Sequence, residues 1–146
     1  MWRLGLVKLR DLKPHEEFIE ARVQLLIEGL LAEGRQIRPI LVDEKTMVIL
    51  DGHHRVEALK RLGAVFVAAL LVDYDSECVT VGSWREGVRV TKEDVRRAGL
   101  EGRLMPPRTS RHRLCFEPPD VNVPLAVLMG ARMPGTRIPG PRAGTG

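Results

Sequence analysis

The spacing of hydrophobic residues divides the chain into short strands and helices. The apolar run from Leu4 to Leu9 predicts a first strand, which Lys13-Pro14 separates from a helix. Apolar residues then recur at helical spacing, and Gly34 is placed to end this helix; its predicted buried face consists of Phe18, Val23, Leu26, Ile27, Leu30 and Leu31. The aliphatic runs Ile40–Val42 and Met47–Leu50 flank a four-residue polar loop, which is the pattern of a β-hairpin.

The same pattern continues through the second half of the chain. A helix ending near Gly63, which suits a left-handed cap, has an apolar stripe of Val56, Leu59 and Leu62. The apolar run Val65–Val72 predicts a buried strand, and Val79–Trp84 is expected to pair with it. Residues 91–94 resemble a capping box and predict a short helix that ends before Gly99. Because helices and strands do not alternate strictly, we expect an α+β fold with a small mixed sheet.

Composition indicates one domain followed by a tail. A chain of 146 residues has room for one hydrophobic core. We expect a folded domain at residues 1–127 and a disordered tail at residues 128–146, which is rich in Gly and Pro and carries three arginines without an acid. Without this tail the net charge falls from +4 to +1, so the folded part lacks the positive charge expected of a nucleic-acid binder.

Other features of the chain bear on location and on the cysteines. No run approaches the ~18 apolar residues that cross a bilayer, and charged residues interrupt the N-terminal segment, so we expect no membrane partner and a cytoplasmic location. Cys78 and Cys115 lie far apart and outside any Cys-x-x-Cys pair. We therefore predict two separate thiols rather than a disulfide or a zinc site.

The segment VILDGHHRVEALKRLG, from Val48 to Gly63, predicts a strand, a tight corner at Gly52 and a helix. The first turn of such a helix offers unpaired N–H groups and the positive end of the helix dipole. His53, His54 and Arg55 fall in that turn, where each side chain can add a donor, so the corner has the chemistry of a phosphate cradle. An exposed polar helix start is the alternative. Zinc is less favoured, because adjacent histidines lack the i, i+4 spacing of a two-histidine site.

Several motifs together resemble a known family. Ile49 to Arg55, with the K-R-L-G-A that follows, looks like the signature of the ParB/sulfiredoxin fold, a small α+β module that binds nucleotide phosphates. Within that fold the chain is most similar to the archaeal free serine kinases, which phosphorylate L-serine to O-phosphoserine for cysteine synthesis. The resemblance spans about residues 4–120 and also rests on L-K-P-H-E at 12–16, on D-Y and a tryptophan at 73, 74 and 84, and on P-R-T-S-R-H-R-L at 107–114.

The resemblance implies roles for individual residues. Glu16 would accept the proton of the serine hydroxyl during attack on the terminal phosphoryl group of ADP or ATP. Asp51 would lie beside that group and hold Mg²⁺ or the substrate. The phosphates would lie against Gly52, His53, His54 and Arg55. The amino acid and its product would contact Trp84, Thr109, Ser110, Arg111 and His112.

The sequence also departs from the resemblance and leaves alternatives open. Larger family members carry a long insertion where about two dozen residues separate Trp84 from Thr109 here, and that insertion bears on the choice between ADP and ATP and on the adenine site. A ParB-like, DNA-associated regulator is the second reading, although the chain after His112 is too short and too rich in Pro and Gly for a helix-turn-helix. A nucleotide sensor without turnover is the third. Sulfiredoxin-like repair is excluded, because His53 stands where its cysteine would be.

Overall fold

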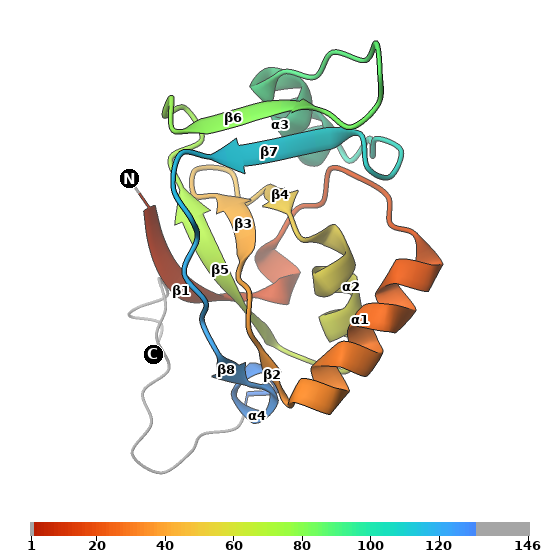
Figure 1. The fold of residues 1–146 in the computed structure, drawn as a ribbon, viewed down its shortest axis with the longest axis vertical. Helices are drawn as coiled ribbons and strands as arrows, with labels where there is room; N and C mark the ends of the chain where they lie inside the picture. The colour runs from red at the N-terminus through yellow and green to blue at the C-terminus, as the bar shows by residue number, and fades with distance from the viewer. Residues whose placement is uncertain (1, 131–146) are drawn as a thin grey trace.

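The computed structural model of the chain describes residues 2–130. Two helices, α1 and α2, lie side by side along one side of a curved sheet, and a two-stranded ribbon crosses its end (Figure 1). The elements in chain order are β1 (Trp2–Lys8), a 3-10 turn (Leu9–Asp11), α1 (Glu20–Glu33), β2 (Arg35–Gln36), β3 (Ile40–Asp43), β4 (Ile49–Asp51), α2 (His53–Arg61), β5 (Phe66–Val72), β6 (Val79–Ser83), α3 (Lys92–Glu101), β7 (Ser110–Leu114), β8 (Val123–Pro124) and α4 (Leu125–Leu128).

The central sheet is mixed and has the strand order β1-β5-β3-β4. β1 is antiparallel to β5, β5 is parallel to β3, and β3 forms the predicted antiparallel hairpin with β4. This arrangement confirms the α+β fold with a small mixed sheet. Short additional pairings join β2 to β8 and β6 to β7.

Alternate residues of the central strands serve two hydrophobic cores. Ile40 and Val42 of β3 face the core that includes Val23 of α1 and Leu59 of α2. Leu41 faces the opposite core, which is covered by residues of β6 and α3. Because side chains alternate along a strand, burial on both faces makes the strands continuous apolar runs, as the sequence has them.

Two predictions about the second half were wrong. The strand Val79–Ser83 does not pair with β5; it pairs with β7, a strand that the sequence analysis missed. The helix α3 begins with the expected capping box but does not end before Gly99, since it continues to Glu101. Gly99 is required for packing, because a Cβ there would lie 2.7 Å from a methyl carbon of Val48, the residue before β4.

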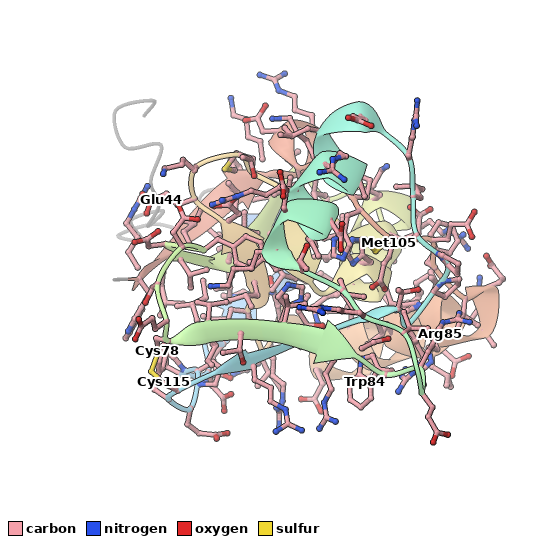
Figure 2. The ribbon with its side chains drawn as sticks, turned by 90° about the horizontal axis from the view of Figure 1, so that it is seen from above. Glu44, Cys78, Trp84, Arg85, Met105 and Cys115 are labelled. Atoms are coloured by element: carbon pink, nitrogen blue, oxygen red, sulfur yellow. A yellow bond between two sulfur atoms is a disulfide. The ribbon has the colours of Figure 1, made fainter. Side chains whose placement is uncertain are left out.

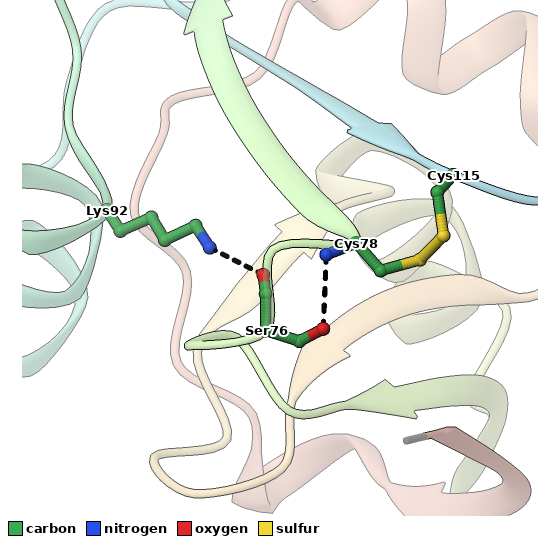
Figure 3. The surroundings of a disulfide bond; sticks show 4 residues. All are labelled: Ser76, Cys78, Lys92 and Cys115. Carbon is green, nitrogen blue, oxygen red and sulfur yellow. Dashed lines mark hydrogen bonds between the residues drawn. A yellow bond between two sulfur atoms is a disulfide. The ribbon is translucent and has the colours of Figure 1, made fainter.

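The prediction of two separate thiols was also wrong, because Cys78 and Cys115 form a disulfide. The register of β6 and β7 sets the two cysteines opposite each other, and the Cys115 N–H donates to the Cys78 carbonyl at 2.9 Å. Ser76 supports the same turn, since its Oγ accepts from the Cys78 N–H at 3.1 Å and its carbonyl accepts from Lys92 Nζ at 2.9 Å (Figure 3). The disulfide therefore fastens the start of β6 to the end of β7.

Three further predictions can be compared with the structure: the helix ends, the start of the tail and the lack of a membrane-crossing helix. Gly34 ends α1 and Gly63 has a left-handed conformation, both as predicted. The predicted buried face of that first helix was partly wrong, because α1 begins at Glu20, after Phe18, and both Phe18 and Leu31 are exposed. Leu128, assigned to the tail, is fully buried in the core beside α1 and α2, and the N–H groups of Met129 and Gly130 donate to the carbonyls of Leu125 and Val127. The rest of the tail prediction concerns residues 131–146, outside the described residues. Between residues 2 and 130, no helix has the length and apolar character needed to cross a membrane.

Candidate active site

A pocket of about 620 Å³ lies where the start of α2 meets α1 and the β6–β7 ribbon. Its lining combines acidic, basic and apolar side chains from five parts of the chain, namely Glu16, Arg22, Leu25, Leu26, Leu50, Asp51, Gly52, His53, His54, Arg55, Trp84, Arg108 and Ser110. The predicted phosphate corner and the predicted catalytic glutamate therefore line one cavity. Its volume lies within the usual range for small-molecule sites.

Gly52 makes the corner possible. Its φ of +111° lies in the left-handed region, and a Cβ at this position would lie 2.8 Å from the Cβ of Ile40. Only glycine fits both constraints. The chain therefore turns directly from β4 into α2, and the free N–H groups of the first turn of α2 lie at the pocket.

The two histidines of the corner act as acceptors through Nε2. His53 Nε2 accepts from the main-chain nitrogens of His15 at 3.0 Å and Glu16 at 3.3 Å, and His54 Nε2 accepts from that of Ile19 at 3.0 Å. The ring proton of each neutral histidine is therefore on Nδ1. The sequence interpretation, in which both side chains add donors for a phosphate, is wrong for these Nε2 atoms, because they hold the segment that carries Glu16.

Arg55 is the cation of the corner. Burial lowers the pKa of its guanidinium, while the nearby Asp51 carboxylate acts in the opposite direction. The Arg55 side chain is half-buried, and a guanidinium with part of its hydration removed gains from an anionic partner. Asp51 itself is exposed at the end of β4, where its carboxylate is open to a ligand.

Glu16 lies on an extended segment fixed at both ends. Lys13 is bonded to the β3–β4 hairpin, since its N–H donates to Met47 and its carbonyl accepts from Ile49. The His15 carbonyl accepts from the Met105 N–H at 2.8 Å, and the Glu17 N–H donates to the Met105 carbonyl at 2.9 Å. The position of the carboxyl group is therefore set by sheet-like main-chain bonds.

The Glu16 carboxylate receives an unusually full set of donors. Oε2 accepts from the Ser110 main-chain N–H and from Ser110 Oγ, each at 2.6 Å, and Oε1 accepts from the Arg108 N–H at 3.1 Å. Burial by itself would raise the pKa of Glu16, but hydrogen bonds involving His15 and Ser110 outweigh it and lower that pKa to about 2. Glu16 is thus ionised at neutral pH.

Trp84 forms one wall of the pocket, just beyond the end of β6 that is opposite the disulfide (Figure 2). Its side chain is half exposed. The guanidinium carbons of Arg108 and Arg111 lie 4.8 and 4.2 Å from the centre of its ring, which is cation–π geometry. Two positive charges therefore lie on the indole that forms this wall, one of them, Arg108, also lining the pocket.

Of the remaining predicted substrate residues, the structure places only Ser110 in the pocket lining. Ser110 reaches the pocket, but its hydroxyl is engaged with Glu16. Thr109, Arg111 and His112 do not line this pocket, although Arg111 lies over the Trp84 ring beside it. The Thr109 hydroxyl donates to the Pro106 carbonyl at 2.6 Å, and His112 Nε2 lies 2.7 Å from the Tyr74 hydroxyl. Thr109 therefore closes the turn before β7, and His112 packs against the Tyr74 ring.

The sequence analysis missed several residues of the pocket lining, namely Arg22, Leu25, Leu26, Leu50 and Arg108. It also missed His15, which lies behind Glu16. The His15 side chain is fully buried, with Nδ1 at 2.6 Å from the Ile49 carbonyl and Nε2 at 2.8 Å from Ser110 Oγ. The available signal was its place in the K-P-H-E motif, immediately before the predicted base. The ring contacts Ser110, a residue 95 positions away, so no local pattern predicts that contact.

The donor set for a metal ion is small. Among residues 2–130, no three His, Cys, Asp or Glu side chains form a group that could hold a metal ion. Mg²⁺ is usually bound through one or two carboxylates together with substrate phosphates and water. Asp51 beside the phosphate corner fits that mode of binding.

Sequence comparison relates the chain to archaeal proteins. No family model matches. The chain is 42% identical over 83 residues to a ParB-like protein of Sulfolobus acidocaldarius, an alignment covering 57% of this chain and 41% of that one. It is 30% identical over 103 residues to the ADP-dependent L-serine kinase SerK of Thermococcus kodakarensis, covering 65% of this chain and 43% of the kinase. The chain thus spans less than half the length of the curated relatives it matches.

Structural comparison gives the fold independently. A free serine kinase solved in complex with AMP superimposes with a TM-score of 0.79 at 20% identity, over 86% of this chain and 93% of that one. The two proteins therefore share a fold. The sequence comparison confirms the predicted resemblance to the L-serine kinases and to a ParB-like protein, and the structural comparison confirms that the α+β fold is shared with a free serine kinase.

Proposed function

We propose that this chain transfers the terminal phosphoryl group of ADP or ATP to the hydroxyl of free L-serine, forming O-phosphoserine, a precursor for cysteine synthesis. The observation that carries the proposal is the position of Glu16, whose ionised carboxylate lines the same pocket as the N-terminus of α2. One cavity therefore offers a phosphate site and an acceptor for a hydroxyl proton. The names of the serine kinase relatives point to the same reaction.

The phosphates of the nucleotide would lie against the first turn of α2. Main-chain N–H groups, the helix dipole and the half-buried Arg55 guanidinium all favour negative charge there. Leu25 and Leu26 of α1 line the same pocket and offer apolar surface for the base. The nucleotide would thus extend from the corner along α1.

The serine would lie between Glu16 and Trp84. Its hydroxyl would face the Glu16 carboxylate, and its own carboxylate would meet the positive rim formed by Arg108 and Arg111. Glu16 would orient the hydroxyl and take its proton as the bond to phosphorus forms. Because phosphoryl transfer has a loose transition state, positioning and charge contribute more than a strong base does.

Asp51 would hold Mg²⁺ together with the transferring phosphates. When bound, Mg²⁺ supplies neutralisation of the charge on the terminal phosphoryl group. Asp51 is suited to this part, since its carboxylate is exposed and lies one residue before the corner glycine.

The test is direct product analysis. The purified full chain is incubated with L-serine, Mg²⁺ and either ADP or ATP, and O-phosphoserine is detected by ³¹P NMR. Product formation with one donor and none without L-serine supports the proposal. Nucleotide binding without product under both conditions would favour a nucleotide sensor instead.

The name of the Sulfolobus acidocaldarius relative favours a second candidate, a ParB-like regulator that associates with DNA. In the kinase the nucleotide is the phosphoryl donor, whereas in the regulator it would control DNA binding. A regulator would show sequence-selective DNA binding that depends on nucleotide, with no phosphorylated serine, in gel shifts of the same preparation.

A further inference from the structure

His15 is a buried histidine whose contacts fix its protons. Nδ1 lies 2.6 Å from the Ile49 carbonyl, which can only accept, so Nδ1 carries a proton. Nε2 lies 2.8 Å from Ser110 Oγ, and Ser110 Oγ donates in turn to Glu16 Oε2 at 2.6 Å. A hydroxyl has one proton to give, so Nε2 must donate to Oγ and carry a second proton.

The arrangement therefore places a charged imidazolium next to an ionised carboxylate. The two side chains are joined through one hydroxyl, and His15 Nε2 lies 3.5 Å from Glu16 Oε2. Both side chains have less than a tenth of their surface exposed. Buried charges that share a hydroxyl titrate as a unit rather than as separate groups.

We infer that Glu16, Ser110 and His15 share one exchangeable proton, and that this unit, rather than Glu16 alone, receives the proton of the substrate hydroxyl. The inference rests on the proposed function, since it describes the base of that reaction. It makes Ser110 and His15 positioning residues that act through Glu16.

The proton movements balance without another reactant. When the unit lacks the shared proton, His15 Nε2 is unprotonated and accepts a hydrogen bond from the Ser110 hydroxyl. This leaves an acceptor position open on Glu16 Oε2. As the serine oxygen bonds to phosphorus and the bond to the nucleotide breaks, the serine proton moves to Oε2. It then passes from Oε2 to Ser110 Oγ while the Oγ proton passes to His15 Nε2. After product leaves, the proton returns through the same atoms to water in the pocket.

The histidines that face the His15 ring stay neutral over the pH range of the tests below. His53 of α2 and His112 of β7 face the ring, with centroids 4.6 and 6.0 Å away. Burial, followed by the positive charge of His15, lowers the pKa of each to about 3. Both are neutral above pH 5, and Lys92 lies further out, over the Tyr74 ring.

The first test compares pH profiles of kcat/KM for L-serine. In the wild type the rate rises with pH as the unit loses its proton. His15→Gln cannot hold the proton, so the rising limb moves to lower pH and kcat falls about 10-fold or more, while the serine KM changes less than threefold. A variant profile parallel to the wild type at every pH would overturn the inference and leave His15 a packing residue.

Matched variants separate the relay from general damage. Ser110→Ala breaks the path, whereas Ser110→Thr keeps a hydroxyl and should retain most of the activity. The double variant His15→Gln/Ser110→Ala should lose no more than either single variant, because both break one path. Multiplicative losses would contradict a shared path. Ser83→Ala, which removes a nearby hydroxyl bonded to the Thr109 carbonyl, is the control with an unchanged profile.

A measurement without substrate keeps the inference testable if a variant fails to fold or the kinase assay is negative. In the full chain with ¹⁵N-labelled histidine, one ring should carry protons on both nitrogens at low pH and lose the Nε2 proton as pH rises. The signal should change in Ser110→Ala. A neutral His15 ring from pH 5 upward, identified by the loss of its signal in His15→Gln, would overturn the shared proton. Absent O-phosphoserine with the doubly protonated His15 ring present would overturn the proposed function alone.

Discussion

The Nε2 atom of His53 lies 3.3 Å from the main-chain nitrogen of Glu16 and accepts its hydrogen bond. The first residue of α2 thus holds the segment that carries the proposed base. The phosphate corner and the base are joined by one neutral ring, which also accepts from the His15 nitrogen. We expect a change at His53 to act first on the base and only then on the phosphates.

His53→Ala tests this connection. It leaves two main-chain N–H groups without their acceptor, at a cost of about 1–3 kcal/mol in unfolding free energy. We expect kcat to fall about 10-fold or more while the Kd for ADP changes less than threefold, because the N–H groups of α2 remain. His53→Gln, which offers a carbonyl acceptor, should do less harm. Weakened ADP binding with kcat preserved would instead make the ring a phosphate ligand.

Glu16→Gln should abolish phosphoryl transfer with little effect on the nucleotide. The amide retains the shape but lacks the basicity of the carboxylate, so kcat should fall ~10²–10⁴-fold. It also replaces one of the two acceptor oxygens by an NH₂ group that faces a main-chain N–H, so a loss of about 1–3 kcal/mol in unfolding free energy is expected. Stopped assays and calorimetric titration with ADP measure the two effects. Undiminished turnover would exclude Glu16 as the base.

Arg55→Ala should weaken nucleotide binding, because a charge-assisted contact to a phosphate is lost. A contribution of about 1.5–3 kcal/mol corresponds to a ~10- to 150-fold rise in Kd. The serine KM should change little. Arg61→Ala is the matched control on the same helix, since Arg61 pairs with Glu20 and Glu57 outside the pocket. Equal affinities for both variants and the wild type would return Arg55 to a structural role.

The part of the site that lies on neighbouring residues could be predicted from the sequence. Gly52 and the helix after it form a local signal, because a glycine between an apolar strand and an amphipathic stripe predicts a corner. The hairpin of β3 and β4 and the caps at Gly34 and Gly63 are local in the same sense. In each case the residues that determine the structure are close together in the sequence.

The parts that were missed depend on long-range pairing. The strand β7 reads Ser-Arg-His-Arg-Leu, which has polar residues on both faces and gives no apolar alternation. Without β7, neither the partner of β6 nor the approach of Cys78 to Cys115 can be predicted. The same strand brings Ser110 to His15, so the buried proton-sharing unit was hidden for the same reason.

The disulfide should stabilise the ribbon that carries Ser110. It links residues 37 positions apart, and a loop of that length contributes about 2–4 kcal/mol by constraining the unfolded chain. Replacing both cysteines by serine should lower the unfolding free energy by that amount in urea titrations. Dithiothreitol should produce the same loss in the wild type and none in the double variant. Equal stability of oxidised and reduced wild type would contradict this prediction.

Stability should fall as pH drops from 7 to 5, because two histidines that are neutral in the folded chain resist protonation there. The pKa values of His53 and His112 are about 3 in the folded chain, against an ordinary value of 6.5. Below about pH 6.5 the unfolded chain binds protons that the folded chain excludes, so unfolding becomes easier as pH decreases towards 3. Glu16 acts in the same direction only between its ordinary pKa of 4.5 and about 2, below this window.

His112→Gln isolates one of these contributions. The glutamine carbonyl can still accept from the Tyr74 hydroxyl, but the side chain does not titrate. Between pH 7 and 5 each excluded proton costs about 1–2 kcal/mol, so the variant should lose less stability over this interval by about that amount. Urea titrations at the two pH values measure the difference. An equal loss in variant and wild type would show that His112 binds its proton in the folded chain as readily as in the unfolded one.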